Sequence, residues 1–156
     1  MSLENEKKSI EGMLAEYREV VTEISKYLPW LESKSGEKPM SLYTPEGAQN
    51  TVSIPVYDPT LLSFVKMLDK TGRMNRNYDY VFKKYRIYSV DDEISMIHRA
   101  ELKDMDMLFA ILSKYVIKGR TKGVFWNEAM ENGVFYETVK KMKELIEFWT
   151  MPIINA

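Results

Sequence analysis

The most apolar helical pattern of the chain runs from Leu102 to Lys118. Its apolar residues recur three and four positions apart, which places them on one face of a helix. They are Met105, Leu108, Phe109, Ile111, Leu112, Tyr115 and Val116. Lys114 and Lys118 suit the negative end of a helix dipole, and Gly119 is a typical stop. We predict that this segment is the central helix of the fold.

Six further segments show the same spacing. They are Ile10 to Leu28, Pro59 to Thr71, Tyr78 to Tyr88, Val90 to Ala100, Val124 to Asn132, and Phe135 to Trp149. Two of them begin with residues that cap helices, Asp58 before Pro59 and Ser89 before an acidic first turn. The sequence YDYVF, which starts at Tyr78, also alternates as a strand does, but its wider spacing favours a helix.

These patterns predict an all-α fold of six or seven helices in a single domain, residues 1–156. Unequal helix lengths and short joints marked by glycine favour orthogonal packing over an up-and-down bundle. Between Glu32 and Tyr57 no period is sustained, and prolines and glycines are frequent. We predict a long irregular connection there, at 32–57, with a short extended piece at Thr51 to Val56.

The composition excludes several kinds of chemistry. The chain has 22 basic and 23 acidic residues, so no overall field favours a polyanion or a membrane surface. Cysteine is absent, which excludes disulfides, thiolate nucleophiles and cysteine-ligated metals. No apolar run approaches the roughly 20 residues of a membrane-spanning helix, and the first residues do not resemble a secretory signal. We therefore expect a cytoplasmic protein with no membrane partner.

No group of residues forms a recognisable catalytic or metal-binding motif. His98 is the only histidine, and it has no cysteine or second histidine with which to share a metal. Asp104 and Asp106 point about 200° apart on a helix, so they are not expected to share a metal. The serines lack the glycines of a nucleophile elbow. We expect no catalytic residue, no metal and no cofactor. Enzyme activity would need acidic and tyrosine side chains from distant segments to converge.

A turn after the central helix, KGRTKG, combines Lys118, Arg120 and Lys122 with Gly119 and Gly123. Exposed amides and cations at such a turn could bind a phosphate. However, the P-loop pattern is missing. A solvated turn, whose cations complement the preceding helix dipole, is the favoured interpretation.

A second candidate for binding a polyanion is the segment from Lys66 to Arg86. Its basic residues are Lys66, Lys70, Arg73, Arg76, Lys83, Lys84 and Arg86, interleaved with Tyr78, Tyr80, Phe82 and Tyr85. Cations and stacking rings together are typical of nucleic-acid binding. Two alternatives remain: the aromatic residues could be core, and the acidic residues that follow could neutralise the cations.

The carboxy-terminal segment is a candidate interface. Phe148, Trp149, Met151 and Ile153 lie close together, where a small domain struggles to cover them all. Methionine and aromatic residues are also enriched at interfaces between proteins. We expect a homo-oligomer, most simply a homodimer, or a complex with another protein.

Three segments resemble a bacterial family of small uncharacterised proteins, a domain of unknown function. They begin at Ile54, Ile97 and Lys118. Residues that match the family pattern are Tyr57, Phe64, Ala100, Leu102, Lys118, Gly119, Arg120, Gly123 and Gly133. The resemblance covers about residues 54–147, although the basic turn here is shorter and lacks the family's glutamate. It implies an all-helical fold and no known activity.

Together these observations favour a non-catalytic interaction or regulatory module that self-associates. The alternative is a nucleic-acid-binding module, with candidate contacts at Lys83, Lys84, Arg86, Lys118, Arg120 and Lys122.

Overall fold

The helix predicted to be central lies in the middle of the structure. The computed structural model describes residues 3–43 and 54–150 of the chain. In it a short 3-10 turn, η1 (Leu102–Asp104), leads into α6 (Met105–Gly119). Buried residues occur all round α6, as expected for a helix enclosed by others. They include Met107, Ala110 and Ser113, which lie off the predicted apolar face.

The all-α class is confirmed. The other helices are α1 (Leu3–Ser25), α2 (Leu28–Lys34), α3 (Pro59–Lys70), α4 (Tyr78–Tyr85), α5 (Val90–Arg99), α7 (Val124–Glu131) and α8 (Val134–Thr150). The described residues thus form eight α-helices, more than the six or seven expected. The additional helix is α2. The first predicted helix was expected to run to Leu28, just before Pro29, but α1 ends at Ser25. Pro29 instead occupies the first turn of α2, where proline loses no hydrogen bond.

Both predicted helix caps are present. The Asp58 carboxylate accepts a hydrogen bond from the Thr60 amide at 2.7 Å, and the Ser89 hydroxyl accepts one from the Asp92 amide at 3.1 Å. The segment beginning at Tyr78 is helical, so the alternation in YDYVF does not produce a strand. Its helix ends at Tyr85, earlier than the predicted Tyr88, and Arg86 follows in a left-handed backbone conformation with φ of 58°.

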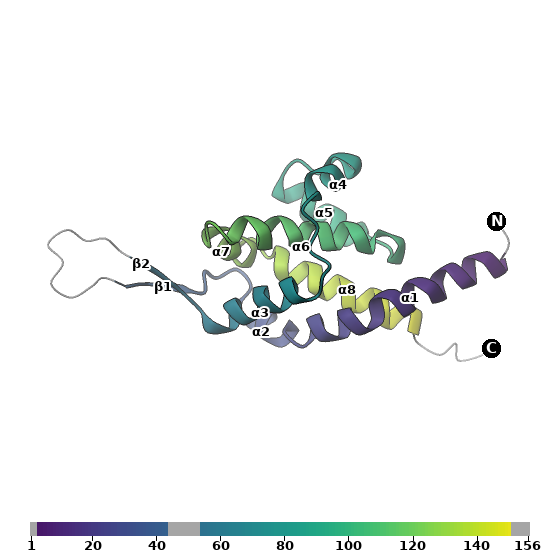
Figure 1. Ribbon diagram of the computed structural model, residues 1–156, viewed down its shortest axis with the longest axis horizontal. Coiled ribbons are helices and arrows are strands. Elements are labelled where there is room, and N and C mark those ends of the chain that lie inside the picture. The colour runs from purple at the N-terminus through teal and green to yellow at the C-terminus, as the bar shows by residue number, and fades with distance from the viewer. Residues whose placement is uncertain (1–2, 44–53, 151–156) are drawn as a thin grey trace, which may run out of the picture.

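The segment expected to be irregular, 32–57, contains regular structure at both ends. Its first residues belong to α2, and two strands follow, β1 (Met40–Tyr43) and β2 (Ile54–Tyr57). The strands pair antiparallel with Met40 opposite Tyr57. The ladder projects from one end of the helical body (Figure 1). Part of the expected extended piece, residues 51–53, lies outside the described residues, and the remainder falls in β2.

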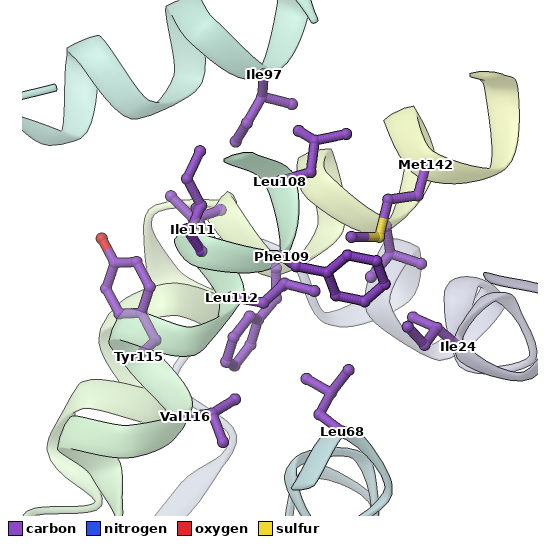
Figure 2. Close-up of a cluster of buried hydrophobic side chains, with 14 of the residues drawn as sticks. Ile24, Leu68, Ile97, Leu108, Phe109, Ile111, Leu112, Tyr115, Val116 and Met142 are labelled. Carbon is purple, nitrogen blue, oxygen red and sulfur yellow. The ribbon is translucent and has the colours of Figure 1, made fainter. Parts of the chain in front are cut away.

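The helices pack around one core (Figures 1 and 2). α1 and α8 run side by side over much of their length, while α4 and α3 lie on opposite sides of α6 (Figure 1). Aromatic rings join the layers: the Phe64 ring of α3 meets the Phe135 ring of α8 edge to face, with centroids 5.1 Å apart. Within the described residues, no helix is both long and apolar enough to cross a bilayer.

Candidate functional site

The basic turn at residues 118–122 joins α6 to α7, and two of its three cations have local partners. Arg120 pairs with Asp69 of α3. The Lys118 ammonium lies 5.4 Å from the centroid of the Phe125 ring, in a cation–π contact. The Lys122 side chain is exposed. Arg120 therefore links the turn to α3, and within the described residues Lys122 has neither an ion-pair nor a cation–π partner.

The two glycines of this turn have packing roles. The Trp126 ring lies directly against Gly119, where an added Cβ would overlap the indole, and its Nε1 donates a hydrogen bond to the Val116 carbonyl at 3.2 Å. At Gly123 an added Cβ would lie 2.6 Å from the Tyr57 hydroxyl oxygen. Neither glycine has a positive φ. Close approach of aromatic rings therefore accounts for both glycines without a phosphate-binding loop.

The predicted basic segment divides into an inward part and an exposed part. Arg73 faces inward: it pairs with Glu16 at 3.0 Å and lies 5.0 Å above the Tyr17 ring. Phe82 is buried, and the Tyr85 hydroxyl donates a hydrogen bond to Asp104 at 3.0 Å. These residues are therefore used by the fold itself.

One group of exposed residues of the basic segment lies on α4 and just after it. Lys83, Lys84 and Arg86 are exposed, and the tyrosines on either side of them, Tyr80 and Tyr88, are 72% and 75% exposed. Within the described residues, none of the three cations has an ion-pair partner. We call Tyr80, Lys83, Lys84, Arg86 and Tyr88 the α4 face.

The α4 face and the basic turn do not form one site. Through Tyr85, the end of α4 is bonded to Asp104, which precedes the first residue of α6. Lys118 lies in the last turn of that 15-residue helix, about 20 Å farther along its axis. The six candidate contacts predicted from the sequence therefore form two clusters, one on α4 and just after it, the other at the end of α6 and in the turn that follows it.

The predicted carboxy-terminal interface is exposed as far as the structure describes it. Phe148 is 66% and Trp149 43% exposed, and their rings meet edge to face with centroids 5.1 Å apart. Trp149 also lines a pocket of about 360 Å³ together with Ile10 and Met13 of α1. Leu102, between Glu101 and Lys103, lines the same pocket. Met151 and Ile153 lie outside the described residues.

The sequence did not predict a buried charged cluster around Glu93, which is 0% exposed. One carboxylate oxygen of Glu93 accepts a hydrogen bond from the Tyr115 hydroxyl at 2.6 Å, and the other accepts one from the Lys114 ammonium at 2.7 Å. The same ammonium lies 5.4 Å from the Phe82 ring centroid. This cluster joins α5 to α6 and α4. One signal in the sequence could have revealed it: Glu93 precedes Ile97 by four residues and so shares its inward face.

Tyrosines and carboxylates do converge in pairs, as catalysis would require, but the pairs are dispersed through the fold. Besides Tyr115 with Glu93, the Tyr17 hydroxyl donates to Asp106 at 2.7 Å. Glu93 and Tyr115 are both fully buried, so no substrate reaches them in this conformation. His98 lies elsewhere, with its Nε2 3.1 Å from a Glu137 oxygen. No cluster of three potential metal-ligating side chains occurs in the described residues.

The paired tyrosines should make the fold sensitive to alkaline pH. Burial, reinforced by the bonded carboxylate, raises the pKa of Tyr85 to about 12 and raises the pKa values of Tyr17 and Tyr115 further. Unfolded tyrosine titrates near pH 10, so above that pH the unfolded chain releases protons that the folded chain keeps. We expect the free energy of unfolding to be unaffected by these groups below about pH 10 and to fall above it.

Urea unfolding between neutral pH and about pH 12 would measure this effect. A Tyr85→Phe variant removes one of the three groups and should show a shallower alkaline decline than the parent protein. Equal slopes for the two proteins above pH 10 would contradict the assignment to Tyr85.

Comparisons with protein-family models, with curated proteins and with solved structures found no match to this chain. The resemblance over about residues 54–147 therefore stays a prediction, and the case for function has to come from the surfaces described above.

Proposed function

We propose that the protein is a non-catalytic interaction module that associates with a second copy of itself through the end where α1 and α8 meet. One observation carries this proposal: an exposed aromatic pair, Phe148 and Trp149, lies at a pocket whose lining combines apolar residues with Ser9, Glu101 and Lys103. The apolar part of the lining comes from Ile10, Met13, Leu102 and Trp149 itself. Large aromatic side chains next to a pocket are typical of the centre of a protein interface.

A second copy is the occupant that this geometry fits best. The projecting ring of Phe148 and the pocket beside Trp149 lie on the same end of the molecule. A twofold axis would therefore allow the Phe148 of each copy to approach the pocket of the other, and one surface would serve both copies. The formal net charge of −1 adds little electrostatic repulsion between identical chains.

The charged residues at the pocket suit the rim of such an interface. Glu101 and Lys103 flank Leu102, and their side chains are 70% and 71% exposed. They pair with each other at 3.6 Å, which adds little to the stability of a monomer. Charges at a rim set the orientation of partners more than they set affinity. Glu101 of one copy could pair with Lys103 of the other across a twofold axis.

Sedimentation equilibrium over a range of protein concentrations tests the proposal. We expect a mass approaching twice that of the chain, and we expect Phe148→Glu to return the protein to a monomer because it places a charge at the apolar contact. The side chain of Phe148 is mostly exposed, so the variant should keep its helical circular dichroism and its unfolding midpoint.

Val124→Glu is the matched control. Val124 is 55% exposed and lies on α7, so this variant makes the same change in charge away from the proposed contact. It should associate as the parent protein does. A parent protein that stays monomeric at every concentration would overturn the proposal, as would a Phe148→Glu variant that still associates normally.

A further inference from the structure

The α4 face has two properties that the core does not require. Its cations are exposed, with the Lys84 ammonium 5.9 Å from the Tyr85 ring centroid, although acidic residues are abundant nearby in the sequence. Its two tyrosines are among the most exposed large side chains of the described residues. Tyr80, Lys83 and Lys84 lie three and four positions apart, so they share one side of α4. A tyrosine that is about three-quarters exposed contributes little to folding, and the fold therefore gives no reason for Tyr80 or Tyr88.

The backbone of Arg86 supplies a separate observation. Arg86 follows α4 in the left-handed conformation and is the only residue other than glycine with positive φ in the part of the chain that the structure describes. Glycine is strongly preferred where a helix ends in this way, because a side chain in the left-handed conformation crowds the backbone. Arginine at this position makes the fold less stable than glycine would. It also adds a guanidinium group close in sequence to Lys83 and Lys84.

Charges on the neighbouring elements leave the face positive. Between Arg76 and Tyr88 there are four basic residues and one acidic residue, Asp79. On α5, Asp92 accepts a hydrogen bond from the Tyr88 amide, and Asp91 is exposed beside it. Asp104 is engaged by Tyr85. Asp79 lies one turn before Lys83 on α4, and Asp91 and Asp92 border the α4 face at its Tyr88 end. Within the described residues none of these carboxylates pairs with the cations of the face.

From these observations we infer that the α4 face binds single-stranded nucleic acid. Lys83, Lys84 and Arg86 would contact successive phosphates, and the rings of Tyr80 and Tyr88 would stack on unpaired bases. Cations interleaved with exposed aromatic rings are the combination by which proteins hold single strands without reading their sequence. A duplex hides the faces of its bases, so the tyrosines favour a single strand over a duplex. This face is distinct from the end of α1 and α8, and the inference does not depend on self-association.

Fluorescence anisotropy of a labelled single-stranded oligonucleotide of about 16 nucleotides, with the chain of 156 residues, tests the inference. We expect binding that weakens as salt rises and that exceeds the binding of a duplex of the same sequence. Replacing Lys83 and Lys84 with alanine together should weaken binding and lower the slope of log affinity against log salt by about 1.4. Tyr80→Ala should weaken binding about tenfold, while Tyr80→Phe, which keeps the ring, should not.

Lys66 and Lys70 provide the matched control. Both are exposed on α3, on the other side of α6 from α4 (Figure 1), and changing both to alanine removes the same charge. This control should bind as the parent protein does. Arg86→Gly should weaken binding and at the same time raise the urea midpoint by about 0.5 M, because glycine relieves the left-handed backbone.

Several results would overturn the inference. They are no binding at low salt, equal loss of binding in the α3 control, equal affinity for the duplex, or a labelled poly-glutamate peptide bound as tightly as the oligonucleotide. The last result would identify an acidic protein partner instead. An Arg86→Gly variant that is stabilised but binds normally would also contradict the role given to Arg86.

Discussion

Replacing Gly119 with alanine is expected to lower the free energy of unfolding by about 2–4 kcal/mol, although alanine is the better helix former. The new methyl group would occupy space now filled by the Trp126 indole. The ring would have to move, and its hydrogen bond to the Val116 carbonyl would be lost or strained. Urea unfolding followed by circular dichroism would measure the loss.

Gly12 offers a control for this substitution within the same chain. It lies inside α1, and an added Cβ there would meet nothing within 4 Å. Gly12→Ala should therefore stabilise the protein by about 0.5–1 kcal/mol through helix propensity alone. The penalty at Gly119 should shrink in a Trp126→Ala background, since the clashing ring is then absent. Similar effects of alanine at Gly119 and Gly12 would show that the indole does not confine Gly119.

The experiment also bears on how the KGRTKG turn is interpreted. Gly119 receives a ring from α7, and Gly123 receives the Tyr57 ring from β2. The same stretch thus packs against two neighbouring elements, and its glycines are explained by contacts that stabilise the fold. Any anion that binds there would depend chiefly on Lys122, because Arg120 and Lys118 already contact Asp69 and Phe125.

Most of the helical architecture could be predicted because its signals are local. A cap such as Asp58 needs only the amide two residues ahead, and an apolar stripe needs only its own helix. α2 was missed for the opposite reason. Pro29 has the same local chemistry whether it ends one helix or begins the next. Leu31 is fully buried in the core, and this burial favours a second helix that begins at Leu28. Burial of this kind is a tertiary effect.

The surfaces were predictable only as lists of residues. Lys83 and Lys118 could both be identified as candidate cations, but the structure leaves Lys83 exposed and places the partly buried Lys118 against the Phe125 ring. Within one short segment, Phe82 is buried while Tyr80 is exposed, and the spacing of aromatic residues alone did not divide them. Phe82 is buried because it lies on the side of α4 that packs against α6, whereas Tyr80 lies on another side.

The Glu93 cluster leads to the second large expected effect. Glu93→Ala should destabilise the protein by about 3–5 kcal/mol, because the Lys114 ammonium and the Tyr115 hydroxyl both lose their acceptor. Lys114→Met should be destabilising as well, since it leaves the fully buried carboxylate without a cation. Tyr115→Phe should cost less, about 1–2 kcal/mol, because the ion pair survives. Urea unfolding of the three variants would compare these costs.

Removing both charges should restore most of the stability lost by either single change. In a Glu93→Leu, Lys114→Met variant no charge is left buried, and two apolar side chains of similar size occupy the space between α5 and α6. Removing one partner of a buried ion pair lowers the free energy of unfolding strongly, because the other charge stays buried without a partner. Replacing both partners with apolar residues costs far less, because neither charge then has to be taken out of water. A double-mutant cycle would measure the coupling between the two positions. If the losses from the single variants simply add, Glu93 and Lys114 do not act as a pair, and the α5–α6 contact depends on its apolar residues alone.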